Sequence, residues 1–373
     1  MRIFMSSGSF DRSYGGPAYS VSRLGRALAD AGADVGLWAP DGSAVRSDVV
    51  PVNGGQGVDR LSRLDGPLQT ALETFGEVDV FHDSGLWWSH NHAINRHAQQ
   101  AGKPVVVSTR GMLAPWAMRH KHWRKKVAWQ LYQRRDLMRA TAIHATSAEE
   151  AGHVAALKLG HTATLIPNGA DLPTDTPSPE TAARTGPRKA VFLGRLHPVK
   201  GLPLALEAWK NVRPDGWVFE IAGPDEDGYR AVLQDQITRL ALEDCVRLIG
   251  AVDGNAKTGL LGAADLFVLP SHSESFGMVV AEALAHGLPV LTTKAVPWPD
   301  LERIDCGWRV PVSVQGLADG LSMATGLSDE ARIAMGVRGH DLVRTQYSWE
   351  SVAKRFLDLY ASVQAGFKTG QVA

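Results

Sequence analysis

The sequence predicts an α/β fold made of two Rossmann-like, doubly wound domains that face a cleft. Short apolar runs of strand length alternate with stretches of helical periodicity along most of the 373 residues. The same opening, a strand followed by a glycine-bearing loop and a helix, occurs near the start of the chain and again near its middle. We therefore expect two parallel sheets, each covered by helices on both faces.

The first opening consists of a strand at 2–5, a loop at 6–17 and a helix at 18–31. Gly32 is expected to end this helix, because glycine readily adopts the left-handed conformation found there. The other strands of the first domain are predicted from apolar runs at 35–38, 78–82, 104–108, 142–146 and 163–166.

The second opening consists of a strand at 190–193, a loop at 194–201 and a helix at 202–212. Its further strands are predicted at 217–222, 246–249, 266–270 and 289–293, and a last helix at about 349–364. Residues 173–180 are rich in proline and small polar residues, which is typical of a linker. The predicted parts are a first domain at 1–172, a linker at 173–189, a second domain at 190–346 and a terminal segment at 347–373.

The bulk composition predicts a globular protein of a reducing cytoplasm. Acidic and basic residues balance, and no apolar run reaches the length of a membrane span. Met1 leads directly into a strand-like run, so no signal peptide is expected. Cys245 and Cys306 are the only cysteines and form no metal-binding or redox motif.

Glu274 and Glu282 are the most informative pair of residues. A buried strand precedes Glu274, and a helix that begins after Gly277 carries Glu282, so both should lie at the carboxyl edge of the sheet, where such sheets bind ligands. The free amides of 276–279 would bind phosphate, whereas carboxylates accept hydrogen bonds from hydroxyls. The pair favours a ligand with both groups, such as a nucleotide sugar. The alternative is an ordinary strand–helix unit with surface acids.

The loop at 194–201 is the second signal. Glycines at both ends let the backbone turn after the strand, and Arg195 and Lys200 offer two cations suited to a diphosphate. The alternative is a solvated basic turn. Because the strand before this loop belongs to the same sheet, we expect it to share an edge with the Glu274 loop.

These motifs resemble the retaining GT-B glycosyltransferases of family 4 (glycosyl transferases group 1), whose Glu-x7-Glu pattern matches Glu274 to Glu282. The resemblance implies that the second domain binds the sugar donor and the first the acceptor, and that the terminal helix crosses back to the first domain. Arg195 and Lys200 would hold the leaving diphosphate, Glu274 the donor sugar and Glu282 the ribose. Further donor-binding residues implied by the resemblance are Gly15, Gly16, Asn168, Gly194, Gly223, Ser275, Phe276, Gly277, Met278 and Val279.

The first domain departs from the family pattern at the stretch 108–113. Many relatives have a histidine where this chain has Arg110, and the Arg-Gly-Met-Leu sequence resembles a subgroup of polysaccharide-assembling enzymes. Arginine cannot act as a base at neutral pH, but it could stabilise the donor phosphate or hold an acidic acceptor. His82, at a strand end, is the other catalytic candidate; the alternative is a hydrogen-bonded structural histidine.

A strongly basic stretch offsets the acidic remainder of the chain. Residues 84–135 contain no Asp or Glu and ten Lys or Arg, including those of the segment 119–135. Trp123, Val127 and Leu131 recur at a spacing of four, which predicts a helix with an apolar stripe. Tryptophans among cations suit an anionic membrane surface. Alternatively, the stripe packs in the core and the cations are solvated or bind the acceptor. No nucleic-acid motif accompanies the patch.

The predicted function is retaining, metal-independent transfer of a hexose from a UDP- or GDP-sugar to a hydroxyl acceptor. The acceptor is expected to be a lipid-linked or saccharide intermediate of polysaccharide biosynthesis. No cofactor or metal is expected, because the spacing of His90, His92 and His97 does not place three ligands together. The protein is predicted to be cytoplasmic, with peripheral attachment to the inner face of the plasma membrane left open. A nucleotide-sugar epimerase, a phosphorylase and a non-catalytic binding module remain as alternatives.

Overall fold

The computed structural model describes residues 1–11, 14–41, 43, 67–119, 122–173 and 186–368. They form two compact units, one made of 1–169 and 349–373, the other of 170–348. Each unit contains one six-stranded sheet in which all pairs are parallel, which confirms the predicted α/β fold class. Most of the predicted linker, 174–185, lies outside the described residues.

The sheet of the first unit has the strand order β2-β1-β3-β4-β5-β6. The chain reverses its direction of travel across this sheet between β1 and β3, which makes their carboxyl ends the topological switch point. The strands are β1 Arg2–Ser6, β2 Asp34–Trp38, β3 Val80–Ser84, β4 Val105–Ser108, β5 Ala142–Ala145 and β6 Thr164–Leu165.

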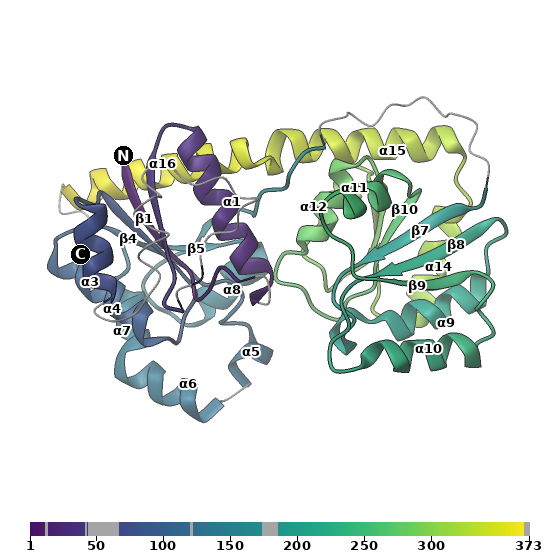
Figure 1. The fold of residues 1–373 in the computed structure, drawn as a ribbon, viewed down its shortest axis with the longest axis horizontal. Coiled ribbons are helices and arrows are strands. Elements are labelled where there is room, and N and C mark those ends of the chain that lie inside the picture. The colour runs from purple at the N-terminus through teal and green to yellow at the C-terminus, as the bar shows by residue number, and fades with distance from the viewer. Residues whose placement is uncertain (12–13, 42, 44–66, 120–121, 174–185, 369–373) are drawn as a thin grey trace. The chain divides into compact units, whose positions relative to one another are not determined.

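Helices cover both faces of this sheet (Figure 1). On one face α1, Gly16–Asp30, packs against the terminal helix α16, Trp349–Lys368, and on the other α4, Ser89–Gln100, packs against α7, Arg134–Arg139. The terminal helix therefore returns to the first unit, as the family resemblance implies. The remaining helices are α3 Pro67–Phe75, α5 Pro115–Arg119, α6 His122–Ala128, the π-helical turn η2 Trp129–Gln133 and α8 Ala148–Ala156.

The sheet of the second unit has the strand order β12-β11-β10-β7-β8-β9. Its switch point lies between β7 and β10, which are direct neighbours. The strands are β7 Arg188–Leu193, β8 Trp217–Ala222, β9 Val246–Gly250, β10 Leu266–Leu269, β11 Val290–Thr293 and β12 Gly307–Val310.

Two groups of helices enclose the second sheet (Figure 1). Helix α9, Leu202–Val212, packs against α10, Tyr229–Arg239, and α14, Val314–Thr325. On the opposite face α12, Met278–Ala285, packs against α15, Asp329–Leu342. The shorter helices are η3 Pro198–Lys200, α11 Gly254–Gly262, α13 Asp300–Arg303 and the π-helical turn η4 Val343–Tyr347.

Among the strands, β12 is the one that the sequence did not predict. It is four residues long at the edge of its sheet, and the side chains of Trp308 and Arg309 are only partly buried. An edge strand needs no continuous apolar run, so periodicity gives little signal there. The predicted strand at 163–166 is also shorter than expected, since only Thr164 and Leu165 pair with β5.

Candidate donor site and comparison with known proteins

The switch point of the second sheet joins the two loops that the sequence singled out. The main-chain N–H of His272 donates to the carbonyl of Val199 at 2.8 Å. Gly201 has a left-handed backbone, with φ of 66°, and a Cβ there would collide with the carbonyl oxygen of Pro270. Glycine is thus required where the loop after β7 meets the loop after β10.

Lys200 and Glu274 form a largely buried ion pair across these loops. The Nζ atom of Lys200 lies 2.5 Å from Oε1 of Glu274, and their side chains are only 15% and 13% exposed. The Ser271 hydroxyl donates to the same carboxylate oxygen at 2.9 Å. The pair places a cation for an anionic ligand directly beside an acceptor for hydroxyls.

Arg195, the second predicted cation, lies on the other side of the β7 loop. Its guanidinium is 2.5 Å from the carboxylate of Glu226, and this pair is open to solvent. The loops after β7 and β8 touch, because a Cβ at Gly223 would collide with the carbonyl oxygen of Gly194. Packing alone therefore requires glycine at 223, and a role for Gly194 and Gly223 in donor binding stays a prediction.

Glu282 also has a basic partner, which the sequence did not identify. Its side chain is almost buried in α12, and Lys257 of α11 donates to Oε1 at 3.0 Å. Lys257 stands 25 residues away in the chain, and no local pattern marks it. A buried carboxylate needs such a partner, so Lys257 holds Glu282 in one position.

The residues between these carboxylates form the start of α12. Gly277 is left-handed, with φ of 79°, and Met278 is the first helical residue. The Phe276 ring is buried against Trp298, whose indole N–H donates to the Phe276 carbonyl at 2.6 Å. The side chain of Phe276 is thus part of the core, and the predicted contact of 275–279 with phosphate rests on the main-chain amides.

In the first unit the structure brings together two predicted residues, Arg110 and Asn168. The Arg110 guanidinium donates to Oδ1 of Asn168 at 2.9 Å, and Arg110 has a left-handed backbone, with φ of 50°. Glu150 supports this loop by accepting hydrogen bonds from Thr109 and Gly111. Burial raises the pKa of Glu150, but these bonds outweigh burial and hold it below its ordinary value. The only sequence signal for Glu150 is the helix-capping pattern Ser147-x-x-Glu150.

His82 belongs to a buried chain of hydrogen bonds. His144 must donate from Nε2 to the carbonyl of Ile166, at 2.7 Å, so its Nδ1 accepts from Ser108. Ser108 in turn accepts from Nε2 of His82 at 2.6 Å, and Nδ1 of His82 accepts from the Tyr360 hydroxyl at 2.5 Å. Burial disfavours the charged form of both imidazoles, and these are the donor and acceptor roles that two neutral rings take.

This arrangement favours the structural role for His82 that the sequence left open. His82 is completely buried and both its ring nitrogens are occupied. Burial holds the pKa of His82 well below its ordinary value and lowers the pKa of His144 to about 4. This chain of hydrogen bonds links α16 to β3, β4 and β5.

Gly15 and Gly16 open α1 at the carboxyl end of β1. Gly15 is left-handed, with φ of 81°, and no atom of the described residues lies within 4 Å of a Cβ added at either position. Among these residues, nothing covers the outer side of this turn. Contact with a donor phosphate stays a prediction.

Among the described residues, no group of three or more His, Cys, Asp and Glu is placed to hold a metal ion. Nδ1 of His92 lies 2.9 Å from the carboxylate of Asp136, within hydrogen-bonding distance. In the same described part of the chain, no helix has both the length and the apolar character needed to cross a bilayer.

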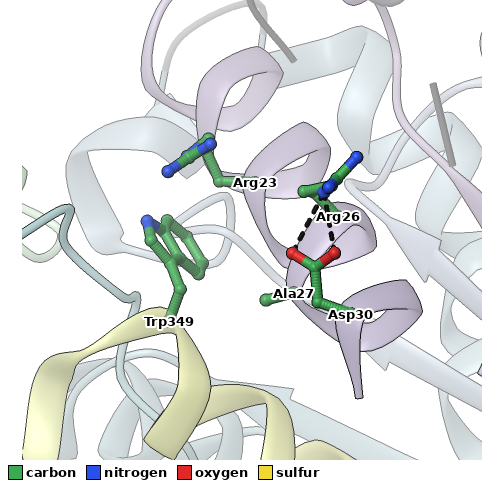
Figure 2. Close-up of a pocket in the computed structure, with 5 residues that line it drawn as sticks. All are labelled: Arg23, Arg26, Ala27, Asp30 and Trp349. Carbon is green, nitrogen blue, oxygen red and sulfur yellow. Dashed lines mark hydrogen bonds and ion pairs between the residues drawn. The ribbon is translucent and has the colours of Figure 1, made fainter. Parts of the chain in front are cut away.

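A surface pocket lies between α1 and the start of α16, lined by Arg23, Arg26, Ala27, Asp30 and Trp349 (Figure 2). Arg26 forms an ion pair with Asp30 at 2.9 Å, so one of the two arginines that line the pocket is neutralised. None of the predicted site residues lines this pocket. This pocket therefore does not coincide with the candidate donor site.

The two doubly wound units and the donor-type loops define the GT-B class of protein. Residues 15–169 match the model of the glycosyl transferase 4-like domain, and residues 174–320 match that of the glycosyl transferases group 1. The chain thus belongs to the family 4 glycosyltransferases of GT-B fold, and it is a glycosyltransferase enzyme.

A curated relative of similar length agrees with this family, and solved structures of similar length agree with the fold. The phosphatidyl-myo-inositol mannosyltransferase of Mycolicibacterium smegmatis is 28% identical over 95% of this chain and 92% of its own. The sucrose-phosphate synthase of Thermosynechococcus elongatus is 18% identical, with a TM-score of 0.76 over 98% of this chain and 99% of its own. HepE of Anabaena, in complex with UDP, is 20% identical, with a TM-score of 0.75 over 97% and 99%.

Proposed function

We propose that this enzyme is a retaining, metal-independent hexosyltransferase. It moves a hexose from a UDP- or GDP-sugar to a hydroxyl of a saccharide or lipid-linked intermediate of polysaccharide biosynthesis. The observation that carries the proposal is the largely buried Lys200–Glu274 pair at the switch point of the second sheet. The diphosphate of a nucleotide sugar would bind the Lys200 cation, and its sugar hydroxyls would donate to the Glu274 carboxylate.

The reaction requires that the charge of the leaving diphosphate be stabilised. The bond from the anomeric carbon to the phosphate oxygen breaks, and its electron pair stays on that oxygen. Lys200, Arg195 and the main-chain amides at the start of α12 would meet this charge, and such stabilisation is often the largest catalytic term. The acceptor oxygen bonds to the anomeric carbon, and its proton passes to the leaving phosphate. Attack on the face that the phosphate leaves retains the configuration.

The known proteins support a nucleotide-sugar donor. HepE of Anabaena has been solved in complex with UDP-glucose, and a relative of this chain is named a phosphatidyl-myo-inositol mannosyltransferase. In this chain the Lys257–Glu282 pair would present the carboxylate to the ribose hydroxyls of such a donor.

The test is a screen of UDP- and GDP-sugars by calorimetry, followed by an assay of the sugar that binds. We expect one donor to bind and to release its nucleoside diphosphate when a hydroxyl acceptor is added, with the product keeping the donor's anomeric configuration. An epimerase would convert the donor sugar without releasing the nucleotide. That result would refute the proposal.

We also propose that the segment 119–135 contacts an anionic membrane surface, at the inner face of the plasma membrane. The exposure of its apolar stripe supports this proposal, because Trp123, Val127 and Leu131 are 67%, 50% and 67% exposed rather than packed in a core. The side chains of Arg124 and Lys126 are exposed as well. An apolar stripe flanked by cations complements a surface that carries anionic headgroups over an apolar layer.

A further inference from the structure

An aromatic surface lies at the switch point of the first sheet, a position that commonly binds ligands in open α/β sheets. Tyr14 stands on the loop after β1, and Trp87 and Trp88 form the turn after β3. His90, in the first turn of α4, completes this group. We call these four residues the Trp88 platform.

Trp88 is exposed and yet held in a single orientation. Its side chain is 53% exposed, and one face of the indole stacks on His90, with ring centroids 6.4 Å apart and planes 16° apart. Tyr14 interacts with Trp88, and its phenol lies against Gly8. Within the described part of the chain, the other face of the indole is thus left open to solvent.

The backbone of the turn is fixed as well. The N–H of Trp87 donates to Gln133 at 2.7 Å, and the Tyr132 hydroxyl donates to the carbonyl of Trp87 at 2.7 Å. The N–H of Trp88 donates to the side chain of Asn91 at 3.3 Å. Trp87 has φ of 80°, a costly left-handed conformation for a bulky residue, and such outliers concentrate at functional sites. The surroundings hold this conformation in place.

Polar groups for hydroxyls stand next to the platform. Ser84 ends the strand before the turn, and its hydroxyl is 3.5 Å from the guanidinium of Arg110. The N–H of Leu86 donates to the sulfur of Met112 at 3.2 Å, so the turn also contacts the Arg110 loop. The platform and Arg110 therefore belong to one edge of the sheet.

We propose that the Trp88 platform binds a pyranose ring of a saccharide acceptor. The face of an indole is electron-rich, and the C–H groups on one side of a pyranose carry a small positive charge, so the two attract and exclude water. The hydroxyls at the rim of the sugar would meet Arg110 and Ser84. The acceptor role rests on the proposed function, whereas the sugar-binding role stands without it.

The platform can be tested on the whole protein with simple glycosides. Methyl α-glucopyranoside, methyl α-mannopyranoside and methyl α-galactopyranoside are titrated in saturation-transfer NMR and in tryptophan fluorescence. We expect at least one to bind, and Trp88→Ala to weaken it by about tenfold. Trp88→Phe, which keeps an aromatic face and guards against misfolding of the alanine variant, should stay within about threefold. Val232→Ala, at an equally exposed residue of α10 in the other unit, should bind like wild type.

Three results would overturn the proposal. They are that no methyl glycoside binds, that Trp88→Ala binds as well as wild type, or that only octyl glucoside binds, which would indicate an alkyl chain on the platform. Glycoside binding at Trp88 without nucleotide release from any donor would instead refute the proposed transfer and leave the platform standing.

Discussion

At the scale of single residues, Lys200 is the most direct test of the catalytic proposal. Its cation would meet the charge that develops on the leaving diphosphate, and it is already fixed beside Glu274. We expect Lys200→Ala to cost about 2–4 kcal/mol of transition-state stabilisation, a loss of roughly 30- to 1,000-fold in kcat/KM. Steady-state kinetics with the donor identified by calorimetry measures this.

A matched control is Lys210→Ala, which removes an exposed lysine of α9, the helix that follows the same loop. Its kcat/KM should equal that of wild type. Near-normal turnover of Lys200→Ala would contradict the assignment.

Metal independence makes a separate prediction. Because Lys200, Arg195 and main-chain amides are proposed to replace a divalent ion, activity should survive dialysis against EDTA. The measurement is the initial rate before and after treatment. A loss that Mg²⁺ or Mn²⁺ restores would show that a metal takes part.

The sequence pointed to candidate site residues that share a local motif. It did not reveal the residues that contact these candidates only in the folded structure. Glu274, Glu282, Arg195 and Lys200 stand on two short segments whose glycines and helix start reveal their geometry. Lys257 and Glu150, in contrast, are ordinary helix residues in sequence. Their importance comes from the carboxylate or the loop that folding brings to them, which a single sequence does not specify.

At the scale of elements, the buried histidine chain predicts a dependence of stability on pH. The folded pKa of His82 and His144 lies below the unfolded value of about 6.5. Between about pH 6.5 and 4 the unfolded state therefore binds more protons, and the free energy of unfolding falls as pH falls, by about 1.4 kcal/mol per pH unit for each histidine. The Asp83 carboxyl, whose pKa burial raises to about 6, contributes with the opposite sign.

The readout is therefore a difference between two proteins. In His82→Asn the slope of unfolding free energy against pH, from denaturant titrations between pH 7 and 5, should decrease by about the share of one histidine. Equal slopes in variant and wild type would show that His82 does not titrate as its burial implies.

The basic segment 119–135 makes the second prediction at this scale. Its periodicity predicted an apolar stripe but could not decide between core and surface, because both place residues at a spacing of four. The structure exposes the stripe, so wild type should float with liposomes that contain anionic lipid and not with neutral ones. A Trp123→Ser, Leu131→Ser variant should lose about tenfold in membrane affinity, since each substitution removes apolar area from the contact. Equal flotation of the variant would favour an acceptor-binding role for the cations.

At the scale of the whole molecule, the alternation of strands and helices predicted two parallel sheets, because the period of apolar residues is a local property. The path of the terminal helix is not local: the return of α16 to the first unit follows from contacts such as that between Tyr360 and His82, 278 residues apart. The sequence implied this return only through a family resemblance. In physical terms, α16 packs on the first unit because its buried side chains fill a part of that core which no local segment fills.

This architecture predicts that the two units depend differently on the end of the chain. The second unit is one continuous segment, 170–348, with its own sheet and core, so that fragment should fold and bind UDP or GDP in calorimetry.

The first unit needs α16, whose Phe356 and Tyr360 are buried against His82 and His144. Removing even one such aromatic typically costs about 3–5 kcal/mol. A chain ending at 348 should therefore show the melting transition of the second unit alone in calorimetry. A second, cooperative transition from 1–169 would refute the assignment.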